Sequence, residues 1–94
     1  MAYGRLDVFW PDGRFKTYTL AEDTVSIGRS NANSIPLETD TLSRYHATIT
    51  YKDGEASLND LDSANGTFVD GVRLKSGEPR ALYGGEEILI GELR

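Results

Sequence analysis

The sequence of 94 residues contains no cysteine and only one histidine, His46. Without cysteine the chain can form neither a disulfide framework nor a thiolate metal site. A single histidine also excludes a multi-histidine metal centre within this chain, and no carboxylate cluster has metal-ligand spacing. The sequence therefore predicts no metal and no cofactor. The lack of cysteine fits a reducing compartment, so we expect a cytoplasmic protein.

Long apolar runs and an excess of basic charge are also missing. No stretch approaches the roughly 20 apolar residues that cross a bilayer, and the first ten residues show no apolar signal segment. Ten Lys and Arg against fifteen Asp and Glu give a net charge of −5, which repels a polyanion at long range. We therefore expect no membrane and no nucleic-acid partner. A small anion in a local basic pocket stays open, because salt screens charges beyond about 8 Å.

Helical periodicity is nearly absent, and short alternating or β-branched runs separated by turn residues take its place. Asp-Gly pairs at 53–54 and 70–71 predict tight hairpins, because a type I′ turn needs positive φ at both central residues. With no internal linker, residues 1–94 are expected to form one domain, an antiparallel all-β sandwich. The predicted strands are 5–10, 14–20, 24–28, 34–38, 45–52, 55–61, 66–70, 79–83 and 86–93.

Alternation along these runs predicts which side chains face the core. In the strand at 45–52, one face carries Ala47, Ile49 and Tyr51, and the other carries His46, Thr48 and Thr50. A sandwich keeps its rigid core in the middle and its loops at the two ends, so function is expected on the loops at 29–34, 38–45 and 62–66. The predicted core residues are Leu6, Val8, Ile27, Ile49, Phe68 and Ile90.

An enzymatic interpretation would use Ser43 as nucleophile and His46 as base, with Asp40 or Asp62 to orient the histidine. No nucleophile elbow supports it, and no glycine-rich oxyanion segment adjoins Ser43. A lone histidine near the start of a strand is more often a structural hydrogen-bonding group. Gly28 belongs to no phosphate-binding glycine motif that opens a helix. The sequence therefore predicts that the protein is not an enzyme.

Three loop segments together favour an anion site. Gly28-Arg29 ends one predicted strand, the segment 43–46 opens another, and the segment 65–67 opens a third. If these loops share one end of the sandwich, they gather guanidinium, hydroxyl and carboxamide donors without an obvious carboxylate partner. A dianionic phosphate suits such a cluster, because each charge-assisted hydrogen bond is worth roughly 1.5–3 kcal/mol.

In this order the motifs resemble the forkhead-associated (FHA) family: Gly28-Arg29, then the Ser43-x-x-His46 spacing, then Asn65-Gly66-Thr67 with the following hairpin. The tail at 82–91 is similar to the family's closing hairpin, so the resemblance covers essentially the whole chain. It implies an FHA/SMAD-like β-sandwich of about eleven strands. It also implies phosphothreonine-peptide binding by loops at one end of that sandwich.

The resemblance further implies a role for each matching residue. Arg29 would bind the phosphate, the Ser43 hydroxyl would donate to a phosphate oxygen, and Arg44 would add a second cationic contact. Asn65 would hydrogen-bond the peptide backbone beside the phosphothreonine. The residues implied to be architectural, bracing the binding loops, are Gly28, His46, Gly66 and Thr67.

One position departs from the family pattern. A Ser or Thr commonly precedes the Asn-Gly pair and helps to bind the phosphopeptide, whereas this chain has Ala64, preceded by Ser63. Losing one donor, at roughly 0.5–1.5 kcal/mol, weakens binding without abolishing it, and Ser63 is expected to point elsewhere. The leading hypothesis is a phosphothreonine-binding module whose partner is a substrate of a Ser/Thr kinase. The alternative is a phosphorylation-independent scaffold or oligomerisation domain that has kept the fold.

Overall fold

The computed structural model describes residues 2–91, which form ten short strands and no helix. None of these residues therefore belongs to a helix that is long and apolar enough to cross a membrane. The strands are β1 (Gly4–Phe9), β2 (Phe15–Leu20), β3 (Thr24–Gly28), β4 (Ile35–Pro36), β5 (Ala47–Lys52), β6 (Glu55–Asp60), β7 (Thr67–Val69), β8 (Val72–Arg73), β9 (Arg80–Leu82) and β10 (Ile88–Ile90).

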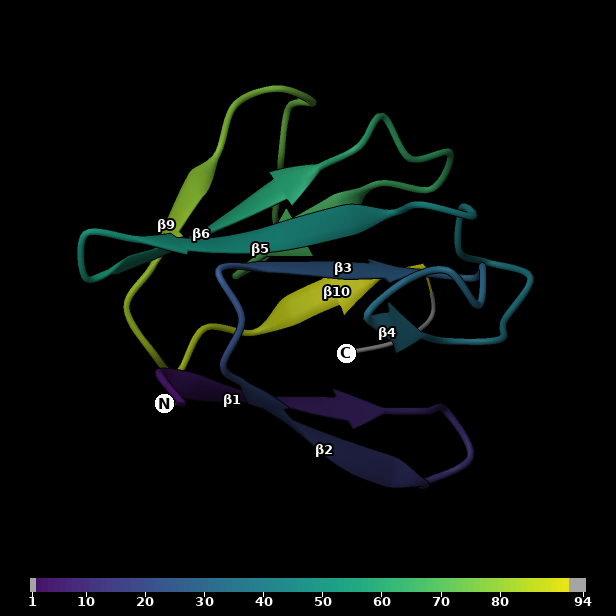
Figure 1. Cartoon of the computed structure of the whole chain (residues 1–94). Helices are drawn as coiled ribbons and strands as arrows, with labels where there is room; N and C mark the ends of the chain where they lie inside the picture. Colours follow the sequence, from purple (N-terminus) through teal and green to yellow (C-terminus); the bar gives the residue numbers. More distant parts are fainter. Residues whose placement is uncertain (1, 92–94) are drawn as a thin grey trace.

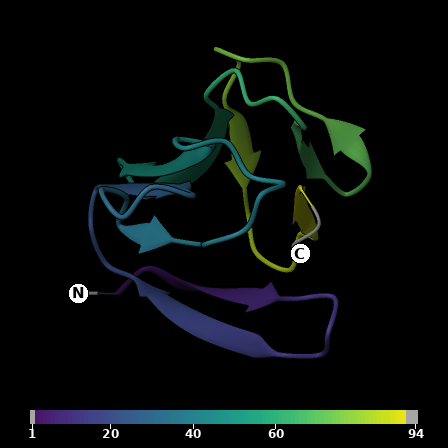
Figure 2. The same ribbon diagram turned by 90° about the vertical axis from the view of Figure 1, so that its right-hand side faces the viewer.

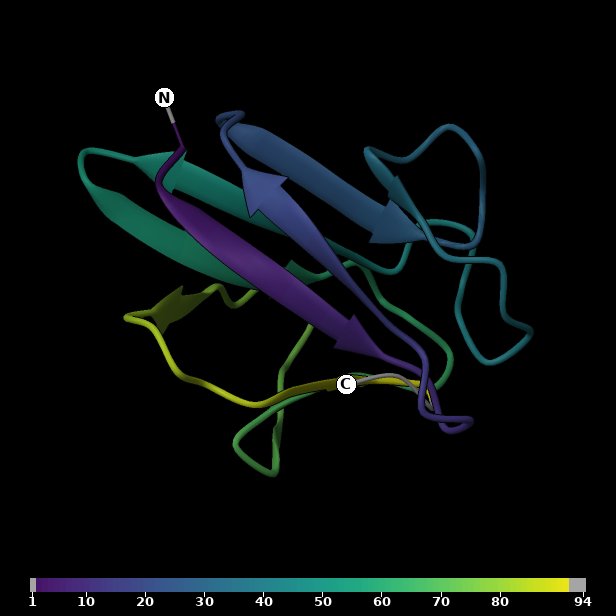
Figure 3. The ribbon, with the colours of Figure 1, turned by 90° about the horizontal axis from the view of Figure 1, so that it is seen from below.

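The strands pack as a β-sandwich, as predicted (Figure 1). One layer is a five-stranded sheet with the order β4-β3-β5-β6-β9. The other layer consists of the hairpin β1-β2 and the three-stranded sheet β10-β7-β8. Seen from below, the axes of β1 and β2 lie roughly parallel to those of the central strands of the five-stranded sheet (Figure 3). Two-residue turns join β5 to β6 and β7 to β8, and the loops that follow β3, β4 and β6 lie together at one end.

The ten strands in residues 2–91 agree with the expected sandwich of about eleven strands. The list of predicted strands lacked β8, although the Asp-Gly pair at 70–71 predicted a hairpin there, and β7 and β8 form that hairpin. One pair is parallel in an otherwise antiparallel fold: β3 and β4 pair through Ile27↔Ile35 and Gly28↔Pro36. The six-residue loop at 29–34 brings the chain back alongside β3. Pro36 has no N–H to donate, which fits its place on an edge strand. Of the strand expected at 86–93, residues 92 and 93 lie outside the described residues.

The central core lies between the two layers. Val8, Ile27, Ile49 and Ile90 are buried in it as predicted, and Leu6 packs against it half-buried. Phe68 does not belong to this cluster, because its neighbours Thr67 and Val69 point inward and alternation turns the ring to the other face. The Arg73 guanidinium lies over that ring, 5.9 Å from its centroid.

His46 was expected within the strand at 45–52, on the face that carries Thr48 and Thr50, and its place in that strand was wrong. The strand begins at Ala47, and the His46 side chain is fully buried in the loop before it. Its backbone is hydrogen-bonded on both sides, since the His46 N–H donates to the Ile27 carbonyl and the Leu61 N–H donates to the His46 carbonyl. Its ring is hydrogen-bonded to the neighbouring loops at Ser43 and Gly66 instead of facing outward.

Candidate functional site

Three loops meet at one end of the sandwich, at the right of Figure 1 and facing the viewer in Figure 2. They follow β3 (residues 29–34), β4 (residues 37–46) and β6 (residues 61–66). Main-chain hydrogen bonds join the first two loops: the Arg29 N–H donates to the Ser43 carbonyl over 3.0 Å, and the Ser30 N–H donates to the Arg44 carbonyl over 3.1 Å. We call these three segments the loop cluster. It contains every residue that the sequence predicted to touch a phosphopeptide.

The end of β3 fits closely against the second loop. A Cβ added to Gly28 would lie 2.2 Å from the Arg44 carbonyl oxygen, so only glycine allows this approach. The same oxygen accepts a hydrogen bond of 2.8 Å from Asn33 Nδ2, which also donates to the Ser30 carbonyl. Sequence reasoning missed Asn33, because its role depends on a contact eleven residues away. These contacts fix the backbone of both Arg29 and Arg44.

Ser43 is held from two sides. Its Oγ accepts a hydrogen bond of 3.0 Å from the Ala64 N–H, and its own N–H donates to His46 Nδ1 over 3.1 Å. A hydroxyl has one proton to donate, and the Ala64 contact uses only an acceptor site. The Ser43 O–H therefore remains able to donate to a ligand. Ala64 contributes its backbone to the site, while its side chain carries no polar group.

The buried His46 ring connects the second loop to the third. Since Nδ1 accepts from Ser43, Nε2 carries the proton and donates to the Gly66 carbonyl over 2.9 Å. Both ring nitrogens are thus used by backbone groups. No nitrogen is left to activate the Ser43 hydroxyl, and the nucleophile–base pair considered from the sequence is not formed.

Gly66 and Asn65 complete the third loop. Gly66 has φ of 86°, a conformation that side-chain-bearing residues rarely adopt, and a Cβ there would lie 2.8 Å from Arg73 Nε. Asn65 Nδ2 donates to the Thr41 carbonyl over 2.7 Å, which joins this loop to the second one. One N–H and the Oδ1 of the exposed carboxamide remain for a ligand.

A buried carboxylate, Asp60, organises the base of the third loop. It accepts hydrogen bonds from the Ser63 N–H, the Ser63 hydroxyl and the Thr67 hydroxyl, the last at 2.6 Å. Burial raises the pKa of Asp60, but the hydrogen bonds from Ser63 and Thr67 lower it by more, so this pKa lies below its usual value. Ser63 accordingly points away from the loop surface, as predicted. Sequence reasoning missed Asp60, although an aspartate three residues before a serine is typical of such side-chain-capped turns.

Arg29 and Arg44 extend their side chains into solvent at the edge of an open depression of about 430 Å³, which Ser30, Asn31 and Glu38 also line. Among the described residues neither guanidinium has an ion-pair partner. The ion pairs found in residues 2–91 join Arg5 to Asp7 and Arg14 to Asp12, and none of these residues lines the depression. The cluster thus presents two unpaired cations, one oriented hydroxyl and a partly free carboxamide. In residues 2–91 no group of His, Asp and Glu could hold a metal ion.

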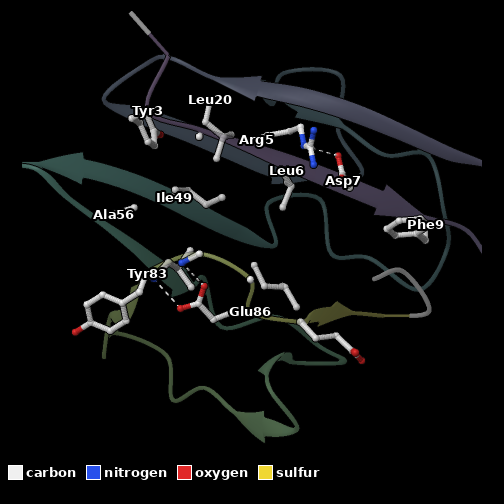
Figure 4. Close-up of a pocket in the computed structure, with 16 residues that line it drawn as sticks. Tyr3, Arg5, Leu6, Asp7, Phe9, Leu20, Ile49, Ala56, Tyr83 and Glu86 are labelled. Carbon is white, nitrogen blue, oxygen red and sulfur yellow. Dashed lines mark hydrogen bonds and ion pairs between the residues drawn. The ribbon is translucent and has the colours of Figure 1, made fainter.

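A second and larger cavity, of about 570 Å³, lies between β1 and the segment 83–88 (Figure 4). We call it the apolar groove, because Leu20 and Ile49 contribute to its lining. Arg5, the arginine beside it, is already paired with Asp7 at 3.3 Å. The Glu86 carboxylate, drawn with its dashed contacts in Figure 4, accepts the N–H groups of Tyr83 and Gly84, each at 2.7 Å. This groove therefore lacks the free cations that a phosphate would need.

Comparison with known proteins agrees with this geometry. The FHA domain family model matches residues 25–91. The chain belongs to the FHA domain family. It is 36% identical over 77 residues to the ABC transporter ATP-binding/permease protein Rv1747 of Mycobacterium tuberculosis, and 35% identical over 77 residues to the glycogen accumulation regulator GarA of Mycolicibacterium smegmatis. Each match covers 82% of this chain but only 9% and 47% of the relative, so the chain spans less than half of either protein.

Solved structures give the same family. The Mycobacterium tuberculosis protein EmbR, in complex with a low-affinity phosphopeptide, superposes with a TM-score of 0.76 at 33% identity, over 89% of this chain and 21% of that one. The N-terminal FHA domain of S. cerevisiae Rad53p, in complex with a phosphothreonine peptide, superposes with a TM-score of 0.78 at 25% identity, over 93% of this chain and 86% of that one.

Proposed function

We propose that this chain is a non-catalytic interaction module that binds phosphothreonine peptides through the loop cluster. The observation that carries the proposal is the pair of exposed guanidiniums, Arg29 and Arg44, on backbone fixed by hydrogen bonds and without ion-pair partners among the described residues. Family membership and the phosphopeptide complexes of EmbR and Rad53p support the same ligand class. Residues 1–94 are proposed to carry this function as one domain.

Each residue has a proposed task that follows from its free hydrogen-bonding groups. The Arg29 guanidinium binds phosphate oxygens, Arg44 adds a second cationic contact, and the Ser43 hydroxyl donates to a phosphate oxygen. The remaining carboxamide groups of Asn65 hold the peptide backbone. Several such contacts, less the cost of ordering a flexible peptide, correspond to a Kd on the order of micromolar.

The proposed partner is a protein that a Ser/Thr kinase has phosphorylated, met in the cytoplasm, with no membrane or nucleic acid in the complex. Phosphorylation adds about −1.5 to −2 charge, which creates the ligand for the two arginines. No catalysis is proposed, because both nitrogens of His46 are engaged with backbone groups and the Ser43 hydroxyl has no base.

Titration calorimetry with one threonine peptide in its phosphorylated and unphosphorylated forms tests this function. We expect binding of the phosphorylated form only, and a loss of at least about tenfold in affinity in the Arg29→Ala variant. Arg14→Ala is the matched control, since Arg14 is also exposed but lies in the β1–β2 hairpin, paired with Asp12. Equal binding of both peptide forms would contradict a phosphate-dependent function.

A phosphorylation-independent scaffold is the second candidate, and Ala64 is the observation that favours it. The hydroxyl donor that the family commonly has there is missing, and Ser63 is committed to Asp60. In that case inorganic phosphate would leave the amide resonances of residues 29–34 and 43–46 unchanged. Shifts of these resonances on addition of phosphate would instead support the binding module.

A further inference from the structure

Glu38 is the one carboxylate that lines the depression beside Arg29 and Arg44. It follows β4, and its backbone is held on both sides. The Leu37 N–H donates to the Gly28 carbonyl over 2.8 Å, the Thr39 N–H donates to the Leu37 carbonyl over 2.9 Å, and the Leu37 side chain is 1% exposed. The Glu38 side chain is therefore exposed on a fixed stretch of backbone. Its place at the site does not depend on a mobile loop.

This carboxylate has no ion-pair partner among the described residues, although it shares the depression with two guanidiniums. Neither Arg29 nor Arg44 forms an ion pair with it, so both guanidiniums are available to a ligand. Once a dianionic phosphate has bound the two guanidiniums, Glu38 leaves one negative charge uncompensated in the same depression. Asp40, which follows two residues later, is also exposed but does not line the depression.

We propose that Glu38 is a specificity-determining residue, which selects phosphothreonine peptides that carry a basic side chain close to the phosphothreonine and disfavours those with an acidic one. The inference rests on the proposed function and names its ligand class more closely. An ammonium or guanidinium group on the peptide supplies the missing positive charge, whereas a carboxylate adds to the repulsion. The net charge of −5 favours the same class of peptide during encounter.

The expected size of this preference is modest, because the charges are exposed to solvent. Exposed pairs at such separations change affinity by about two- to fivefold at low salt. The preference should shrink as the ionic strength rises, since salt screens exposed charges. The Glu38 charge should also change the ratio of Kd values between lysine and glutamate peptides much more than the Kd of a peptide with neutral flanking residues.

The test is a set of short phosphothreonine peptides with alanine at the three positions on either side. In each further peptide one flanking alanine is replaced by lysine or by glutamate, and Kd values are measured by fluorescence anisotropy in 50 mM and 500 mM NaCl. At one or more positions we expect the lysine peptide to bind about threefold or more tightly than the glutamate peptide at low salt. At the same position, Glu38→Gln should bring the ratio close to one.

Two further variants make the result specific. Glu55→Gln removes an exposed carboxylate at the β5–β6 turn, at the other end of the sandwich, and should keep the ratio of the parent protein. Glu38→Lys reverses the charge and should favour the glutamate peptide, which a merely structural defect would not do. A ratio that Glu38→Gln and Glu38→Lys leave unchanged would overturn this inference while the proposed function stands. Failure of the parent protein to bind any phosphorylated peptide would overturn the proposed function, and this inference with it.

Discussion

The loop cluster and the apolar groove are both hollows on the same small sandwich, yet their construction is opposite. In the loop cluster, backbone and side-chain polar groups from three loops hydrogen-bond to one another, and charged groups stand free at the surface. In the apolar groove the nearby arginine is paired with Asp7, and the sheet edges beside it, β1 and β10, each pair with a neighbour on one side only. The groove has the larger volume. Unpaired cations on hydrogen-bonded backbone nevertheless indicate an anion site better than volume does.

If the two regions are constructed differently, substitutions at the apolar groove should lower stability without weakening phosphopeptide binding. Ile49→Ala should have the largest effect, because Ile49 is 1% exposed and lines the apolar groove at the core. Truncation of such a residue lowers the free energy of unfolding by about 2–5 kcal/mol. Urea unfolding measures this loss, and the phosphopeptide Kd of the folded protein should change less than about twofold. Tyr83→Ala is the control, since this groove residue is 89% exposed and should shift stability by less than about 0.5 kcal/mol.

Gly28→Ala should affect both properties at once. The new Cβ would lie 2.2 Å from the Arg44 carbonyl oxygen and 2.9 Å from Asn33 Nδ2, so the backbone that carries Arg29 and Arg44 must shift. We expect a loss of about 1–3 kcal/mol in stability together with weaker peptide binding by about tenfold or more. Gly54→Ala is the contrasting variant, because its Cβ would meet nothing within 4 Å and any cost there comes from its φ of 79° alone. Gly54→Ala should leave the Kd unchanged, and a Gly28→Ala protein with parental affinity would contradict the close-packing argument.

The sequence predicted the features that depend on local residue patterns better than those that depend on how the loops fold back. Strands such as β2 and β3 were predicted to within one residue, because alternation and turn residues act locally. The loop cluster was predicted from the order of its motifs. The parallel pairing of β4 and the contact of Asn33 with Arg44 were not, since each depends on how a loop folds back against the sheet. The hydrogen bonds of Asp60 were also missed, although Ser63 and Thr67 are only three and seven residues away. Phe68 was misplaced because hydrophobicity alone does not say which face of a three-residue strand is buried.

The hydrogen bonds that Asp60 accepts at the base of the third loop can be tested through the pH dependence of stability. Its pKa in the folded protein is lowered, so ionised Asp60 stabilises the fold above the unfolded pKa of about 3.9. This contribution is lost as the pH falls through the lower folded pKa. Asp60→Asn should lower stability at neutral pH and make the decline below about pH 4 shallower than in the parent protein. Urea unfolding between pH 7 and pH 2.5 measures both effects, and parallel profiles for the two proteins would contradict this role.

The smallest effect is expected at Ala64, where the substitution adds a hydrogen-bonding group to the loop cluster instead of removing one. Ala64 already donates its N–H to Ser43 Oγ, so its side chain stands beside the hydroxyl proposed to bind phosphate. Ala64→Ser adds a donor there without disturbing that backbone contact, and a typical hydrogen bond contributes about 0.5–1.5 kcal/mol. Phosphopeptide affinity should therefore rise by about two- to tenfold, with binding of the unphosphorylated peptide unchanged. Ala21→Ser, an exposed change between β2 and β3, is the control and should have no effect on affinity. A gain in Ala64→Ser that also appears with the unphosphorylated peptide would mean that the new hydroxyl contacts the peptide backbone and not the phosphate.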